Sequence, residues 1–309
     1  MVAAVLYRVF EVGSGIIPEQ QRVRVERRMR GWFEDVRLRR ADAAVVSFGK
    51  SGRTWLRVML SRVYAKRHGL NEDALMRFGE FKRKSNGAVP AILFTHDNYL
   101  GDYTGHGDDK SDYAGHKVVL LVRDPADTAV SQYFQWRHRM RRHKKVINDY
   151  PRTDGESVSM FDFIVGEQAG LPKVIRFMNL WAEALQRLPH VMVLRYEDLR
   201  DDTAGRLAAT LTFLGTPATA AEIADAVEYA RLDNMRQREA EGAVDSRRLR
   251  AADKSNPDSF KARRAKVGGY RDYFDAAQLD VIDQLIRGTL SPVFGYGVEA
   301  PASADPPLR

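Results

Sequence analysis

The chain contains no cysteine among its 309 residues. This absence excludes a framework of disulfides, and it also excludes catalysis by a thiolate. A chain without cysteine fits a reducing compartment. We therefore expect a cytoplasmic protein, with the inner face of the membrane as a further expected location.

Long hydrophobic runs are also missing, because no stretch approaches the roughly 20 apolar residues that span a bilayer. The first ten residues lack a basic leader and a clear cleavage site, so we predict no signal peptide. Residues 1–40 are expected to form a helical extension, with five arginines between positions 22 and 30. Two interpretations of this basic segment stay open: a peripheral contact with an anionic membrane, or a helix packed on the main domain.

Internal repeats and metal-ligand spacings are absent as well, so we expect no metal cofactor. The formal net charge of +8 favours acidic partners such as nucleotide donors, anionic glycans, phospholipid surfaces or nucleic acid. Charge alone does not choose among these partners, and nothing in the sequence indicates an oligomeric state.

Strand patterns alternate with helical patterns along the chain, which predicts βαβ units and a largely parallel sheet. The expected strands cover residues 43–48, 91–95, 118–122 and 191–194, and the expected helices cover residues 52–67, 126–143, 160–168, 172–188, 203–214, 220–230 and 276–290. Residues 144–159 are expected to form a loop. We predict an α/β, three-layer sandwich over residues 41–299, followed by a disordered tail at 300–309.

One stretch combines a strand end, a tight turn and a helix start. An apolar run ends at Gly49, and Lys50, Ser51 and Gly52 follow before helical periodicity begins. This layout collects backbone N–H groups at a helix N-terminus, where phosphate or sulfate-like anions bind. The standard Walker A pattern is not met, because Ala44 stands where its first glycine would fall.

The run Lys-Ser-Gly-Arg-Thr-Trp at 50–55 resembles the 5′-phosphosulfate loop of sulfotransferases that use 3′-phosphoadenosine 5′-phosphosulfate (PAPS). Three further stretches match that family in the same order. They are the Arg-Asp-Pro run from Arg123 to Ser131, the Tyr-Glu-Asp-Leu segment at Tyr196, and a C-terminal basic segment with Arg263, Arg264 and Gly268. The resemblance implies a PAPS-dependent enzyme with a P-loop-like fold and no metal.

The resemblance also implies roles for these residues. Lys50 would stabilise charge on the departing 5′-phosphate, and Trp55 and Tyr196 would lie near the adenine. The 5′-phosphate would be cradled by Ser51, Gly52, Arg53 and Thr54, and the 3′-phosphate would be held by Arg123, Ser131, Arg263, Arg264 and Gly268. Two departures stand out: Ala265 replaces an expected glycine, and Arg53 replaces the usual threonine or serine.

The acceptor hydroxyl needs a base. The run Phe-Thr-His at 94–96 resembles the family's Lys-Thr-His, whose histidine takes the acceptor proton, and imidazole suits that task at neutral pH. We therefore predict His96 as the base. Asp97, His106 and His116 stay open as alternatives.

Three variable segments are expected to wall the acceptor pocket: residues 97–115, 137–160 and 236–262. The cationic cluster at 137–145 suits an anionic glycan, a glycolipid or a membrane surface, although it is equally explained as a solvated helix end. We expect the protein to transfer a sulfuryl group to an acceptor hydroxyl, and a carbohydrate or glycolipid is one option for that acceptor. We do not expect nucleic acid as a partner. Two rival functions stay open here, an ATP-dependent P-loop kinase and a non-enzymatic basic protein that binds membranes or nucleic acid.

Overall fold

The computed structural model describes residues 18–152, 157–241 and 266–297, and these contain a four-stranded, fully parallel sheet. The strands, in the spatial order β2-β1-β3-β4, are β2 (Ile92–Thr95), β1 (Ala43–Val46), β3 (Lys117–Val122) and β4 (Val191–Arg195). All four strands therefore end at the same edge, which is where ligands bind in open parallel sheets.

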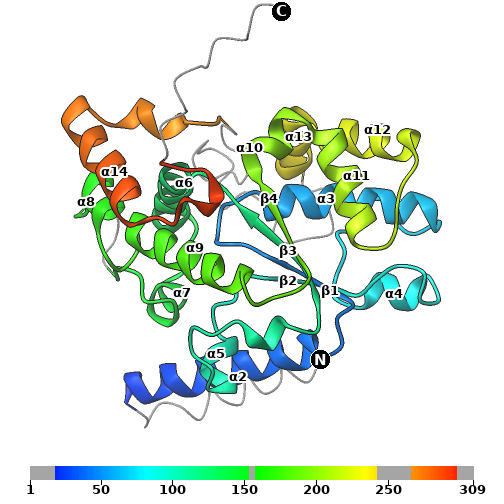
Figure 1. Cartoon of the computed structure of the whole chain (residues 1–309), viewed down its shortest axis with the longest axis horizontal. Helices are drawn as coiled ribbons and strands as arrows, with labels where there is room; N and C mark the ends of the chain where they lie inside the picture. Colours follow the sequence, from blue (N-terminus) through cyan, green and yellow to red (C-terminus); the bar gives the residue numbers. More distant parts are fainter. Residues whose placement is uncertain (1–17, 153–156, 242–265, 298–309) are drawn as a thin grey trace, which may run out of the picture.

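The sheet is covered on both faces by helices, as Figure 1 shows. Ala44 and Val46 of β1 pack into one buried cluster, whereas Ala43 and Val45 pack into the other. The first cluster involves α6 (Pro125–His138), α8 (Met160–Val165), α9 (Leu171–Leu185) and α14 (Ala276–Thr289), and the second involves α3 (Arg53–Arg67), α11 (Thr203–Phe213) and α12 (Ala220–Tyr229). The predicted three-layer α/β sandwich is confirmed.

The remaining helices are short except for α2 and α13. They are α2 (Glu19–Leu38), α4 (Glu80–Lys84), α5 (Leu100–Thr104), α7 (Arg142–Ile147), α10 (Tyr196–Asp201) and α13 (Leu232–Glu241), with 3₁₀ segments at Ser111–Tyr113, Gly269–Tyr273 and Pro292–Phe294. Most of residues 236–262, and the predicted tail, lie outside the described residues.

One sequence-based boundary is wrong. The helix expected over residues 126–143 ends at His138, and a separate helix, α7, begins at Arg142 and runs to Ile147, into the loop expected at residues 144–159. Ile147 is buried, and the Lys145 ammonium lies 4.5 Å from the centre of the buried Trp136 ring. Apolar burial and a cation–π contact therefore stabilise a turn that looks merely polar in the sequence.

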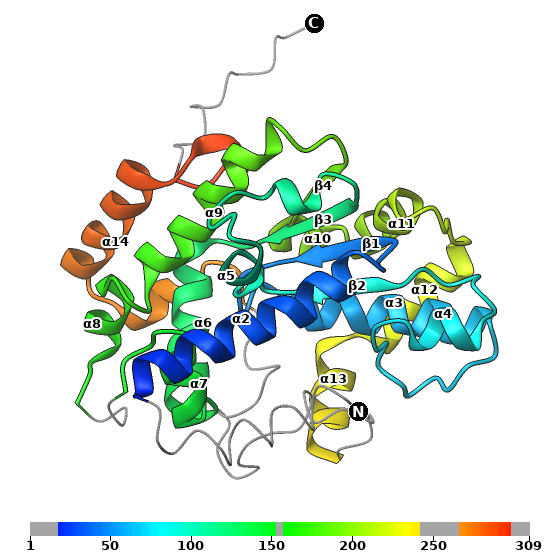
Figure 2. The same cartoon turned by 90° about the horizontal axis from the view of Figure 1, so that it is seen from below.

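The basic N-terminal helix α2 lies along the domain beside α5, as Figure 2 shows. Two of its arginines make contacts within the protein. Arg27 donates to Asp102 and to the Ile147 carbonyl, and Arg30 pairs with the buried Glu26. Arg24 and Arg28 stay exposed. Within the described ranges, no helix combines the length and the apolar character needed to cross a bilayer.

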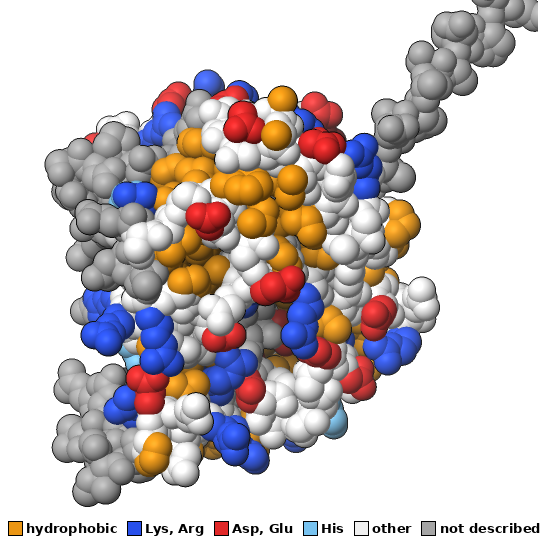
Figure 3. Space-filling view, turned by 90° about the vertical axis from the view of Figure 1, so that its left-hand side faces the viewer, with side chains coloured by type: hydrophobic (Ala, Val, Ile, Leu, Met, Phe, Trp, Pro, Cys, Tyr) orange, Lys and Arg blue, Asp and Glu red, His pale blue; other side chains and the backbone are white. Residues whose placement is uncertain are grey.

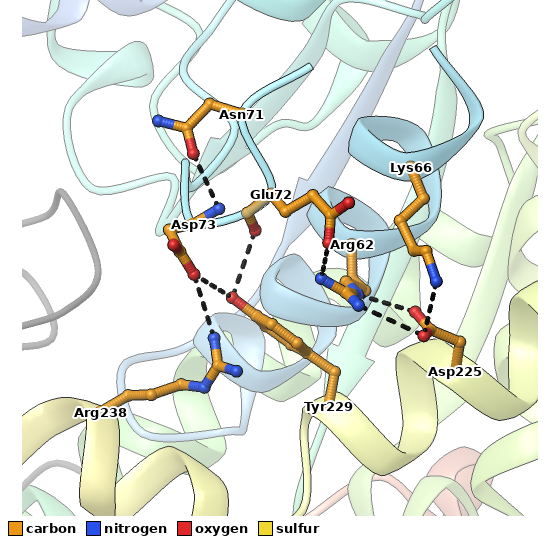
Figure 4. Close-up of polar contacts among 8 residues, drawn as sticks. All are labelled: Arg62, Lys66, Asn71, Glu72, Asp73, Asp225, Tyr229 and Arg238. Atoms are coloured by element: carbon orange, nitrogen blue, oxygen red, sulfur yellow. Dashed lines mark hydrogen bonds and ion pairs between the residues drawn. The ribbon is translucent and has the colours of Figure 1, made fainter. Parts of the chain in front are cut away.

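A polar network joins α12 to α3, and joins α13 to the segment that follows α3 (Figure 4). Arg62 of α3 donates to Asp225 of α12 at 2.7 Å. Tyr229, at the end of α12, donates to Asp73 at 3.2 Å, and Arg238 of α13 reaches the same carboxylate at 3.3 Å. These contacts fix the junction between α12 and α13, whose Ala230 carbonyl forms part of the site described below.

Candidate active site

The loop between β1 and α3 has the geometry of an anion-binding turn. Lys50 and Gly52 both adopt left-handed backbone conformations, with φ of 74° and 92°. Gly52 is the N-cap of α3, so the loop and the first helical turn present their N–H groups together. The structure thus brings Lys50, Ser51, Gly52, Arg53 and Thr54 together at the carboxyl edge of the sheet.

Two features require glycine at position 52: its left-handed backbone conformation and the close approach of the Tyr196 ring. A Cβ atom added there would lie 2.6 Å from Cδ2 of Tyr196. We expect Gly52→Ala to destabilise the protein by roughly 1–3 kcal/mol in urea unfolding, because the left-handed conformation and the clash act together. Gly69→Ala is the matched control, since Gly69 has φ of +60° and nothing within 4 Å of such a Cβ. Equal effects of the two substitutions would contradict a role for the Tyr196 contact.

Arg123 joins the loop to three other parts of the chain. Its Nη1 donates to the Lys50 carbonyl at 3.3 Å and to Ser131 Oγ at 3.4 Å. Its Nη2 donates to Asp127 and to the Lys266 carbonyl, each at 3.2 Å. The predicted pair Arg123 and Ser131 therefore lies directly beside the Lys50 loop.

The buried guanidinium of Arg123 can donate a further hydrogen bond to a bound anion. Its Nε is buried and has no hydrogen-bond partner within the described residues. Its guanidinium also lies 4.5 Å from the centre of the Tyr196 ring. A buried donor left without a partner costs free energy, and a phosphate oxygen would satisfy it. The residues present therefore fit a second phosphate group next to the first.

Asp127 is a functional residue that the sequence analysis missed as a site residue. Its carboxylate accepts hydrogen bonds from the backbone N–H groups of Gly268 and Tyr270, both at 2.9 Å, as well as from Arg123. Asp127 thus docks the C-terminal segment onto Arg123. Asp127 could have been identified from the sequence, because it is the second aspartate of the Arg-Asp-Pro-x-Asp motif. Arg263 and Arg264 lie outside the described residues, so their predicted role stays a prediction.

Two predicted aromatic residues form a neighbouring pocket wall. The rings of Trp55 and Tyr196 meet edge to face with centroids 6.0 Å apart, and the Trp55 indole N–H donates to the Ala230 carbonyl at 2.9 Å. Arg200 lies over the Trp55 ring at 5.5 Å. Such a wall of aromatic rings suits a flat heterocycle.

His96 follows β2 and faces the loop. Its Nδ1 lies 2.8 Å from the Ser47 carbonyl oxygen, which can only accept, so we assign the proton to Nδ1. Its Nε2 therefore carries the lone pair and accepts from Nη2 of Arg53 at 2.7 Å. The contact with Arg53 was not visible in the sequence.

The alternative bases are placed less favourably. Asp97 pairs with Lys110 at 2.8 Å and accepts from the Tyr113 hydroxyl at 3.0 Å, so both carboxylate oxygens are engaged. His106 is exposed and contacts Asp112. Neither His106 nor His116 lines the cleft that contains Lys50 and His96, as far as the described chain shows.

Glu34 of α2 is an acid close behind this site that sequence reasoning did not single out. Its carboxylate accepts from the Thr95 hydroxyl, one residue before His96. Burial raises the pKa of Glu34 to about 8, the nearby Asp97 adds to the rise, and Arg53 opposes it. Glu34 is therefore mostly uncharged at neutral pH.

A cavity of about 1530 Å³ contains the loop, His96 and Arg123, and it extends to Arg139, Arg141 and Lys144. Figure 3 shows the left-hand side of the view in Figure 1, and Lys and Arg side chains, interspersed with Asp and Glu, occupy much of its lower half. Burial lowers the pKa of Lys144 to about 8, and the neighbouring Arg30 adds to the fall. Three cations of the cluster at 137–145 have partners within the protein: Arg137 donates to the Tyr133 hydroxyl, Arg139 pairs with Glu239, and Lys145 lies over the Trp136 ring.

Comparison with known proteins assigns the class. The profile of the sulfotransferase domain matches residues 114–294, which is more than half of the chain, and the chain therefore belongs to the sulfotransferase family. The match includes the positions of Arg123, Ser131, Tyr196 and Gly268 but begins after the Lys50 loop and His96. The predicted family is confirmed.

Individual relatives agree with this assignment. Cytosolic sulfotransferases 15 and 14 of Arabidopsis thaliana are 26% and 24% identical to the chain, each covering 81% of it, and the aligned parts are 72% and 75% of the two relatives. The crystal structure of mouse sulfotransferase SULT7A1 complexed with PAP, the desulfated donor, matches with a TM-score of 0.54 and 19% identity, covering 81% of this chain and 84% of that one. The structural likeness supports the shared fold.

Proposed function

We propose that the enzyme transfers the sulfuryl group of PAPS to an acceptor hydroxyl, giving PAP and a sulfate ester. The observation that carries this proposal is the pair of adjacent anion sites. Arg123 Nη1 contacts both the Lys50 carbonyl, at 3.3 Å, and Ser131, at 3.4 Å, so the loop and the second site share one guanidinium. PAPS carries a 5′-phosphosulfate and a 3′-phosphate, and the paired sites suit this arrangement. ATP has no 3′-phosphate, and Ala44 stands where a Walker A glycine would be.

The proposed reaction is an in-line transfer in which the chain positions groups and stabilises charge. The acceptor oxygen forms a bond to sulfur while the bond from sulfur to the 5′-phosphate oxygen breaks, and the electron pair stays on that oxygen. Lys50 stabilises the charge that develops there. The acceptor proton moves to Nε2 of His96, because Nδ1–H is held by the Ser47 carbonyl.

A polar, anionic acceptor, such as a carbohydrate or glycolipid hydroxyl, is the acceptor class we propose. The cavity is lined by Arg141 and Lys144, and these cations would favour a substrate that carries phosphate, sulfate or carboxylate groups. Arg139 also lines the cavity, but it pairs with the buried Glu239 at 3.4 Å. Incubation with PAPS labelled in the sulfuryl group, across acidic glycans, neutral glycosides and phenols, tests the proposal. We expect labelled esters first among the acidic sugars. A panel that yields neither ester nor PAP would contradict sulfuryl transfer.

We also propose a cytoplasmic location, as the names of the two Arabidopsis relatives state for those proteins. Peripheral membrane contact through Arg24 and Arg28 on α2 remains part of this proposal, because these two side chains are exposed while Arg27 and Arg30 are engaged within the protein.

Arg123→Ala is expected to weaken PAP binding roughly 10- to 100-fold, since a charged hydrogen bond contributes about 1.5–3 kcal/mol. Calorimetric titration with PAP measures the effect. Arg206→Ala is the matched control, because it removes the same charge from a side chain that is 48% exposed on α11. Unchanged PAP affinity in correctly folded Arg123→Ala would contradict the assigned 3′-phosphate site.

A further inference from the structure

Arg53 is the residue of the loop that departs from the family pattern, and the structure gives it a specific position. It is the first residue of α3, directly after the left-handed Gly52. From there its Nη2 reaches Nε2 of His96 at 2.7 Å. A threonine or serine at position 53 would be too short to span this gap. The guanidinium therefore lies between the anion-binding turn and the proposed base.

The hydrogen bond to Arg53 occupies the atom that the base needs. His96 holds its Nδ1 proton against the Ser47 carbonyl at 2.8 Å, so Nε2 carries the only lone pair available on the ring. A guanidinium does not give up its proton at neutral pH, and it therefore blocks this lone pair without providing a proton acceptor of its own. Transfer of the acceptor proton to Nε2 requires Arg53 to leave.

We propose that Arg53 binds the sulfuryl oxygens of the donor and, by moving onto them, releases Nε2 of His96 for catalysis. This inference rests on the proposed function, because it needs a phosphosulfate in the loop. Anionic oxygens are stronger acceptors for a guanidinium than a neutral imidazole, so the exchange is favourable once the donor binds. Because the base is released only when the sulfuryl group is present, Arg53 couples donor binding to activation of the acceptor.

Two acids, Glu34 and Asp97, lie close to this contact. Glu34 is mostly uncharged at neutral pH because burial raises its pKa to about 8. Asp97 is engaged by Lys110 and Tyr113.

The step balances without a further reactant. As the acceptor oxygen bonds to sulfur, the bond from sulfur to the 5′-phosphate oxygen breaks, and its electron pair stays on the phosphate beside Lys50. The acceptor proton passes to Nε2 of His96. Arg53 exchanges no proton and only stabilises the charge on the sulfuryl oxygens.

Comparison of PAPS with PAP tests the inference, because the two nucleotides differ only in the sulfuryl group. We expect Arg53→Thr to weaken PAPS binding at least tenfold and to change PAP binding less than twofold, with Arg53→Lys intermediate for PAPS. Arg206→Thr on α11 controls for the loss of charge. Equal losses for both nucleotides would assign Arg53 to loop structure and overturn the inference, as would no loss for either. A wild-type protein that binds neither nucleotide would instead contradict the proposed function.

Nitrogen NMR of histidine-labelled protein provides a second readout that needs no acceptor. We expect PAPS to shift the Nε2 signal of His96, and PAP to leave it near its ligand-free position. In Arg53→Thr the signal should lie at the released position before any nucleotide is added. A His96 signal that PAPS leaves unchanged would mean that Arg53 keeps its hydrogen bond, and this would overturn the release step.

Discussion

Replacing Lys50 by methionine is expected to lower kcat by roughly 10²–10³-fold, the usual loss when one preorganised charge donor is removed from a transition state. Lys50 follows Gly49 in the turn between β1 and α3, where its left-handed backbone, with φ of 74°, is part of the anion-binding geometry. In the proposed mechanism, its ammonium stabilises the charge on the departing 5′-phosphate, and this charge is larger in the transition state than in bound PAPS. The loss should therefore exceed any loss of PAP affinity.

Steady-state kinetics with PAPS and an identified acceptor, together with PAP titration, separate the two effects. Lys84→Met is the matched control, because Lys84 is 44% exposed and pairs with Glu80 on the short surface helix α4. If Lys50→Met lost PAP affinity in full proportion to kcat/KM while kcat stayed normal, Lys50 would be a binding residue without a role in the chemical step.

His96→Ala is expected to lower kcat by about 10²–10⁴-fold, the range for loss of a general base, while PAP binds nearly as tightly as before. In the proposed mechanism, the Nε2 atom receives the acceptor proton. His106→Ala and Asp97→Asn are the comparison variants. His106→Ala should retain normal turnover because His106 lies outside the cleft lining. Near-normal turnover of His96→Ala would place the base elsewhere, and Asp97→Asn would then show whether that carboxylate supplies it.

The layers of the fold could be predicted because burial on both faces leaves a clear pattern. Residues 118–122 of β3 form an uninterrupted apolar run, since Val118 and Leu120 face one core cluster while Val119 and Leu121 face the other. The helix α7 could not be predicted, because its stability depends on Lys145 lying over Trp136, a contact that no local pattern reveals.

The pairing of Arg123 with Ser131 could also be predicted, because the two residues are eight positions apart and meet at the end of β3. The Arg53–His96 contact was not, because it joins two elements 43 positions apart through the rotamer of one long side chain. Asp127 shows an intermediate case. Asp127 is part of the sequence motif. Its hydrogen bonds with the backbone of Gly268 and Tyr270, however, become apparent only from the folded structure, in which the C-terminal segment packs on α6.

We propose that the loop at Lys50 and the site at Arg123 together bind a nucleotide with both a 5′- and a 3′-phosphate. Thermal unfolding in the presence of PAP, ATP with Mg²⁺, or 5′-AMP tests this claim most directly, since a ligand raises the unfolding temperature in proportion to the logarithm of its concentration over Kd. We predict a clear increase with PAP, a small one with 5′-AMP and none with ATP and Mg²⁺. An increase with ATP and Mg²⁺ but none with PAP would contradict the account.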